Sequence, residues 1–206
     1  MTLEIWLAFV AAVAVFFVIP GPTMILVVSE AINHGKKSVI PLVSGVLLGD
    51  FVAMSLSLLG LGAILATSAT LFLVLKWLGV CYLIYLGIKT WRQAPTLFSD
   101  KNKSNASSKK MLSSAFIVTA LNPKDIIFFV AFLPQFVNPA SSVLPQLLIL
   151  MATFLIIDML NIFLYTVFAR TMRLKISNIK TQIRINKVGG SALIGAGMVT
   201  ASIQRG

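Results

Sequence analysis

The chain has 206 residues, of which 58% are hydrophobic and only 11% charged, and its mean hydropathy is +0.95. Soluble domains carry about 25% charged residues, so this composition excludes an ordinary soluble protein and indicates an integral membrane protein. The single cysteine, Cys81, excludes an intramolecular disulfide framework and a cysteine-based metal cluster.

The predicted elements are apolar segments of about 20 residues or more, the length a helix needs to cross a bilayer. The first lacks a preceding basic region and a convincing cleavage site, so we interpret it as a retained span rather than a signal peptide. The runs are continuously apolar rather than alternating, which favours helices over a β-barrel. The last is short and rich in small residues, so five spans are the alternative to six. We predict a single all-α transmembrane domain over 1–206, a six-helix bundle with these spans: 3–28, 39–64, 69–91, 111–135, 143–168 and 188–203.

The connecting segments predict the orientation of the spans. Fourteen of the 17 basic residues lie in alternate segments, namely 29–38, 89–110 and 169–187, whereas 65–68 and 136–142 contain none. The positive-inside rule therefore places the basic segments, including a flexible loop over 93–110, in the cytoplasm and both termini outside. The net charge of +11 is mainly a topology signal. It favours contact with anionic lipid headgroups and not nucleic-acid binding.

Two halves of three spans each flank the 93–110 loop. Because three is odd, the second half enters the membrane from the opposite side. The first span of each half contains a proline break, at Pro20-Gly21-Pro22 and at Asn122-Pro123, and the second span contains an aspartate, Asp50 or Asp158. This correspondence predicts a 3+3 inverted-topology repeat, an architecture common among transporters.

Four charged residues lie within the predicted spans: Asp50, Lys124, Asp125 and Asp158. Each charge at a helix centre costs about 2.5–3.5 kcal/mol on insertion scales, so these side chains are expected to face the protein interior rather than lipid. They form either an ion-pair network that fixes helix packing or a substrate or proton pathway. We favour the pathway because intramembrane carboxylates commonly mark one.

Lys124 can neutralise one of the three carboxylates. The other two remain to hold a cation or take up protons. Asp158 is the strongest candidate, since Asn161 lies three residues on and shares its helix face. The proline breaks free backbone carbonyls in the preceding turn, and Gly21 permits a sharper unwinding. Two ordinary proline kinks are the alternative. If the breaks form a binding site instead, the N-terminus of a half-helix would receive a substrate carboxylate, while backbone carbonyls and aspartates would receive an ammonium group or a proton.

Missing residue types narrow the function further. His34 is the only histidine and lies in a connecting segment, and no phosphate-binding P-loop motif is present. We therefore predict no metal site, no cofactor and no enzymatic activity; an aspartate dyad of Asp50 and Asp158 lacks any surrounding signature. Gly45-xxx-Gly49 and Ser191-xxx-Gly195 permit close helix approach, for which packing within one chain is favoured over a homodimer.

These motifs resemble those of the lysine exporter (LysE/RhtB) family of bacterial amino-acid and homoserine-lactone efflux transporters. The motifs that carry the resemblance are PGP at 20–22, GxxxGD at 45–50, YLIYLGIKTWR at 82–92 and NPK at 122–124. The resemblance implies a six-helix inner-membrane exporter driven by the proton motive force, most similar to the threonine/homoserine type. It assigns the family's motif positions to Pro20, Gly21, Pro22, Asn122, Pro123, Lys124 and Asp158, and it implies a role for Asp50 in substrate choice.

The resulting prediction is a secondary active exporter of zwitterionic or cationic amino acids or their derivatives. Asp158 with Asp50 binds the ammonium group or the coupling proton, and Lys124 binds the carboxylate. Asn122, Asp125 and Asn161 complete the site, and the two proline breaks form the gate. The partners are then a small amino-acid substrate and the lipid bilayer, with a homodimer left open. A passive channel or facilitator for small zwitterions and a non-transporting membrane scaffold are the alternatives.

Overall fold

A computed structural model describes residues 1–18, 21–67, 69–92, 107–138, 141–169, 171 and 178–202, and every regular element in this part of the chain is helical. The α-helices are α1 (Leu3–Val18), α2 (Pro22–His34), α3 (Val39–Thr67), α4 (Ala69–Arg92), α5 (Ser108–Ala120), α6 (Pro123–Ile127), α7 (Val143–Val167) and α9 (Ile179–Ser202). Three shorter elements are the 3-10 turn η1 (Gly35–Ser38), the π-helical turn η2 (Phe128–Phe132) and the 3-10 turn η3 (Leu133–Phe136).

The helices have the apolar character of membrane spans. Among the described residues, Pro22–Gly60 and Val143–Val167 are long and apolar enough to cross a bilayer, and α5 with Pro123–Phe136 makes a third if this bent pair is one span. Large apolar side chains also lie on the outer surface, for example Ile40, Leu59 and Ile156. Such surfaces are stable facing lipid tails and unfavourable facing water. The protein is therefore an all-helical membrane protein, whereas the number of six spans stays a prediction.

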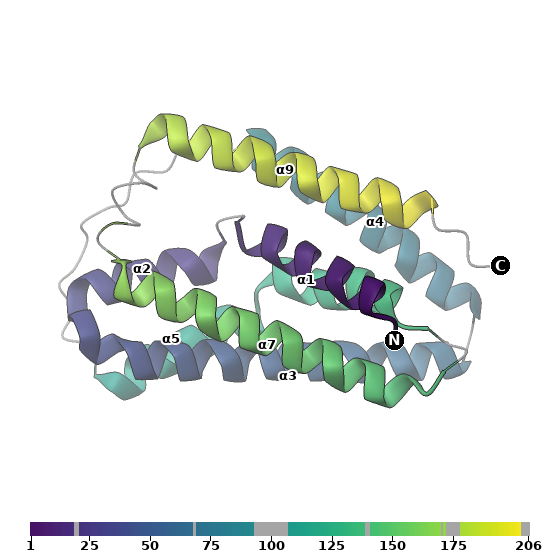
Figure 1. Ribbon diagram of the computed structural model, residues 1–206, viewed down its shortest axis with the longest axis horizontal. Coiled ribbons are helices and arrows are strands. Elements are labelled where there is room, and N and C mark those ends of the chain that lie inside the picture. The colour runs from purple at the N-terminus through teal and green to yellow at the C-terminus, as the bar shows by residue number, and fades with distance from the viewer. Residues whose placement is uncertain are drawn as a thin grey trace.

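Figure 1 shows α4 and α9 side by side along one edge of the molecule, with α3, α5 and α7 at the opposite edge and α1 between them. Glycines allow the closest of these contacts. A Cβ atom on Gly190 of α9 would lie 2.6 Å from the carbonyl oxygen of Gly87 on α4. Two helices can approach this closely only where one of them lacks a side chain.

The Gly45-xxx-Gly49 motif packs α3 against α5. A Cβ atom on Gly45 would lie 2.5 Å from the carbonyl oxygen of Leu112, and one on Gly49 would lie 2.8 Å from Thr119 Cβ. The prediction that this motif serves packing within the chain is confirmed. For the second motif the expectation of close packing is wrong within the described part of the chain, because the Cβ position of Gly195 has no atom within 4 Å.

Two helices begin inside segments that were predicted as loops, because polar residues cap them. α5 begins at Ser108, not at 111, since the Ser107 hydroxyl accepts a hydrogen bond of 3.3 Å from the backbone N–H of Lys110. α9 begins at Ile179, nine residues before the predicted sixth span, where Asn178 Oδ1 accepts from the backbone N–H of Lys180 at 3.0 Å. The remainder of the predicted flexible loop, 93–106, lies outside the described residues.

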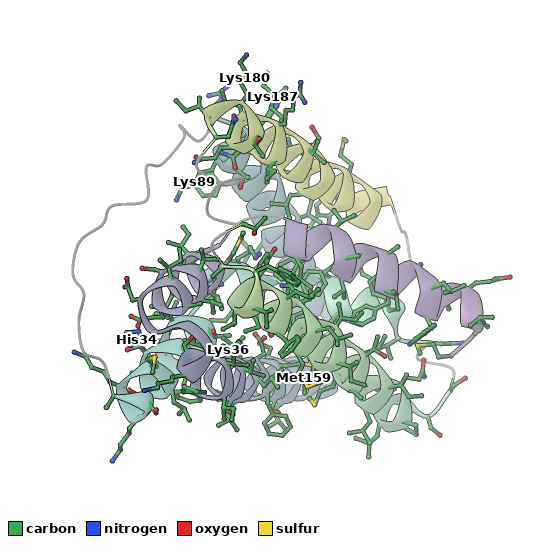
Figure 2. All side chains as sticks on the ribbon, turned by 60° about the vertical axis from the view of Figure 1, so that its left-hand side comes forward. His34, Lys36, Lys89, Met159, Lys180 and Lys187 are labelled. Atoms are coloured by element: carbon green, nitrogen blue, oxygen red, sulfur yellow. The ribbon has the colours of Figure 1, made fainter. Side chains whose placement is uncertain are left out.

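The start of α1 and the end of α9 lie at one end of the molecule in Figure 1, and the turn between α2 and α3 lies at the other. In Figure 2, Lys36, Lys89, Lys180 and Lys187 all lie toward the end that carries this turn. The bundle therefore has a basic end, which lies opposite the end at which the chain begins. The predicted topology places this basic end in the cytoplasm.

Candidate functional site

Two helix breaks lie at the centre of the molecule. α1 ends at Val18 and α2 begins at Pro22, while α5 ends at Ala120 and α6 begins at Pro123. Each proline occupies the first helical position, where its missing N–H leaves no hydrogen bond unmade. The axis through the second break bends by 42°. Both predicted breaks are thus present, although Pro20 itself lies outside the described residues.

The two helices that start at these breaks are capped differently. Asn122 Oδ1 accepts a hydrogen bond of 3.1 Å from the backbone N–H of Lys124, which caps α6. α2 starts after Gly21 and has no side-chain cap, so the amides of its first turn remain open to an anion. Gly21 has φ −120° and ψ 178°, so the backbone is unwound there, in an extended conformation that any residue adopts.

The carbonyl groups that the first break releases are bound by side chains from distant helices. The Phe16 carbonyl accepts from Lys124 Nζ at 3.3 Å, and the Phe17 carbonyl accepts from the Tyr165 hydroxyl at 3.3 Å. Lys124 Nζ also lies 4.0 Å from the centroid of the Phe16 ring, which is a cation–π contact. The end of α1 is therefore held by α6 and α7 rather than by its own backbone.

Asp50 of α3 and Asp158 of α7 face each other in the interior, and each is only 2% exposed. Both side chains line the same small cavity. Among the described residues, Asp50 Oδ1 and Asp158 Oδ2 have no hydrogen-bond donor. Two bare carboxylates in one small cavity away from water would repel each other strongly, so the pair is suited to holding a proton or a cation between them.

Amide and hydroxyl groups surround this acid pair. Asn161 lines the same cavity from α7, three residues after Asp158. Asn122 lines it together with the buried Asp125, and its amide donates to Thr23 Oγ1 at 3.4 Å. Thr23 Oγ1 in turn lies 3.3 Å from Thr119 Oγ1. These contacts join the first turn of α2 directly to the second helix break.

All six residues predicted to bind substrate or protons line one cavity of about 30 Å³, together with Gly21. They are Asp50, Asn122, Lys124, Asp125, Asp158 and Asn161. The volume is enough for about two water molecules. Pro22 and Pro123 start the helices that enter the cavity and do not line it.

Sequence reasoning missed two polar residues of this cavity, Thr23 and Tyr165. A signal for Tyr165 was present, because it lies four residues after Asn161 and seven after Asp158, and thus on the same face of α7. The importance of Thr23 follows only from its contacts with the second helix break. Nothing in its own neighbourhood of the sequence distinguishes it.

The cavity lies near the middle of the bundle. Asp50 is 11 residues from the start of α3, about 17 Å along the axis, and Asp158 is nine residues from the end of α7, about 14 Å. Both distances run from the basic end of the molecule, since α3 and α7 run in opposite directions (Figure 1). Each distance is about half of 30 Å, the typical thickness of a hydrocarbon core.

Apolar clusters flank the cavity toward both ends of the bundle. The N-terminal cluster, toward the end where the chain begins, comes from α1, α3, the η2–η3 segment and α7 and includes Phe9, Phe16, Phe129 and Phe154. The basic-end cluster comes from α2, α3, α5 and α7 and includes Val27, Leu42, Met111 and Ile162. The charged groups therefore lie between two apolar layers.

A helical membrane protein whose broken helices enclose buried charges of both signs has the architecture of a membrane transporter. The chain matches the LysE type translocator family over residues 14–203, and it belongs to this family. The resemblance found in its motifs is thereby confirmed. The family consists of transporters, so the chain is not an enzyme.

Related proteins cover the whole chain. It is 33% identical over 202 residues to an uncharacterized membrane protein of Vibrio cholerae, with 98% of each chain covered. It is 32% identical over 202 residues to the homoserine/homoserine lactone efflux protein of Salmonella typhimurium, again with 98% of each chain covered. A leucine efflux protein of Enterobacter sp. is 33% identical over 137 residues, 63% of each chain. No solved structure shows significant similarity to the chain.

Proposed function

We propose that the chain is a secondary active exporter of amino acids or amino-acid derivatives across the bacterial inner membrane, driven by proton entry. The observation that carries this proposal is the cavity between the two helix breaks, which holds Lys124 opposite the Asp50–Asp158 pair. A zwitterion needs a cation for its carboxylate and an anion for its ammonium group. The efflux of homoserine and of leucine by similar proteins, as their names state, supports the same substrate class.

The substrate carboxylate is expected to bind at the start of α2. The first-turn amides of Thr23 and Met24 lack a side-chain cap, both residues line the cavity, and Lys124 Nζ lies 3.5 Å from the position of a Gly21 Cβ atom. Open amides and a positive helix end together favour an anion. The ammonium group is then directed toward the Asp50–Asp158 pair, where Asn161 orients Asp158.

Coupling follows from competition for the same carboxyl groups. The pair shares one proton in its substrate-binding form and carries one negative charge, and a second proton arriving from outside makes it uncharged, which weakens its hold on an ammonium group and releases the substrate outward. Loss of that proton to the cytoplasm restores the negative charge and prepares the pair for another substrate. One site thus exchanges protons for amino acids, because the coupling proton and the substrate occupy it in turn.

Movement of the helix breaks would open the site alternately to the two sides. A cavity of about 30 Å³ is too small for an amino acid, so substrate entry requires the basic-end cluster or the N-terminal cluster to part.

The paired breaks, together with Asp50 and Asp158 in corresponding helices, support one six-span domain with a 3+3 inverted repeat. The basic end supports a cytoplasmic position for that end and periplasmic termini. A homodimer stays an open alternative.

Reconstitution tests the proposed function. An efflux screen of cells with and without the protein identifies the substrate, and proteoliposomes with an imposed pH gradient then measure its transport. We expect uptake against the substrate gradient, abolished by a protonophore. A passive channel or facilitator would only equilibrate the substrate, so uphill transport excludes it. A non-transporting scaffold would leave efflux from the cells unchanged.

Lys124 is expected to bind the substrate carboxylate. Replacing it with methionine removes a charge-assisted hydrogen bond of about 1.5–3 kcal/mol, so we expect the KM for export to rise about 10- to 150-fold. Lys110→Met is the matched control, because Lys110 lies exposed on α5. Substrate dependence of transport in proteoliposomes measures both. The scaffold alternative instead requires that Lys124→Met combined with Asp158→Leu folds and leaves the phenotype of the cells unchanged.

A further inference from the structure

A second cavity, of about 270 Å³, lies on the outer surface between α3 and α7. Its walls are apolar apart from one serine and include Ile40, Val43, Ser44, Met159 and Phe163. We call it the α3–α7 groove. Ile40 is 78% exposed, so the groove opens outward, away from the polar cavity. Its two walls are nevertheless the outer sides of the helices that carry Asp50 and Asp158.

A basic turn lies at one end of the groove. Lys36 and Lys37 belong to η1, which leads directly into α3 and also packs against α7. Both lysines are exposed, and Figure 2 shows Lys36 and Met159 on the same side of the molecule, away from α4 and α9. The turn has a defined shape, because Gly35 adopts φ 59° and its carbonyl accepts a hydrogen bond of 2.6 Å from Ser38 Oγ.

Positive charge near this turn exceeds negative charge. Among the described residues, the acidic side chain nearest in sequence is Glu30, and one of its carboxylate oxygens lies 3.1 Å from His34 Nδ1. The two lysines therefore present a net positive charge at the end of an apolar groove. An amphiphile with an anionic head and a hydrocarbon tail complements this combination.

We propose that the α3–α7 groove binds one anionic phospholipid, with an acyl chain along the groove and its phosphate at Lys36 and Lys37. A basic pocket between membrane helices is a recognised type of site for anionic headgroups, and each lysine near the surface contributes about 1 kcal/mol to such binding. The bound chain contacts α3 and α7 together. Its occupancy is therefore coupled to any motion that changes the separation of Asp50 and Asp158.

Native mass spectrometry of the full-length protein, titrated with phosphatidylglycerol or phosphatidylcholine, tests this site. We expect phosphatidylglycerol to bind about thirtyfold more tightly, the ratio that two lysines supply. Lys36→Gln with Lys37→Gln should remove this preference. Lys109→Gln with Lys110→Gln removes the same charge from the exposed start of α5 and should preserve it. Ser44→Phe, which fills the groove, should weaken the binding of both lipids.

Two results would overturn the proposal. The first is that the Lys36/Lys37 and Lys109/Lys110 double variants lose the preference for phosphatidylglycerol equally. This would mean that the lipid is attracted diffusely to the basic end. The second is occupation of the groove by another copy of the chain. Ile40→Cys in a Cys81→Ser background detects such a copy, because it would form a disulfide-linked dimer in liposomes. Neither measurement depends on transport, so failure here is separate from failure of the proposed exporter function.

Discussion

Asp158→Asn is expected to lower proton-driven transport about 10- to 150-fold while the protein still folds. The substitution keeps the size of the side chain and its contact with Asn161, but it removes the group that alternates between a proton and an ammonium group. Loss of a charge-assisted hydrogen bond of about 1.5–3 kcal/mol sets this range. Initial rates of uptake into proteoliposomes with an imposed pH gradient measure the effect.

The stability of the same variant separates function from folding. Asp50 and Asp158 face each other in the interior, each 2% exposed, so an uncharged partner removes repulsion between two buried acids. We therefore expect Asp158→Asn to unfold at a temperature equal to or above that of the wild type. Asp158→Glu keeps the carboxyl group and should retain part of the transport. Wild-type transport by Asp158→Asn would show that the coupling role is wrong.

Gly45→Val is expected to have the largest effect on stability. A Cβ atom at this position would lie 2.5 Å from the Leu112 carbonyl oxygen and 2.8 Å from Ala115 Cβ, so α3 and α5 must separate to admit it. Overpacking of this kind typically costs about 1–3 kcal/mol. Since α5 leads directly into the helix break that carries Lys124, we expect transport to fall as well. Thermal unfolding in detergent and transport in proteoliposomes measure the two effects.

Gly60→Ala provides the control on the same helix. The Cβ position of Gly60 has no atom within 4 Å, and alanine is a better helix former than glycine by about 0.8–1.0 kcal/mol. We expect this variant to be as stable as the wild type or more stable. If Gly45→Val were equally stable, α3 and α5 would not pack as closely as described. Their contact would then not position the second helix break.

Much of the fold followed from local signals. Apolar length predicted the helices, since a bilayer admits only segments that satisfy their own backbone hydrogen bonds. Proline predicted both helix breaks, because it can neither donate a backbone hydrogen bond nor continue the preceding turn. The start of α9 at Ile179 was missed because that first turn is polar, whereas the prediction depended on hydropathy. Its capping residue, Asn178, was nevertheless visible in the sequence.

The sequence by itself determined that the protein is a helical membrane protein, where its helices break and which charged residues are too costly to face lipid. These properties depend on each residue type and its immediate neighbours. Only the tertiary structure decided that Asp50 meets Asp158, that Lys124 and Tyr165 bind the carbonyls at the end of α1, and that Gly87 rather than Gly195 approaches another helix. Such contacts join residues far apart in the chain. They depend on how whole helices pack, which no local pattern specifies.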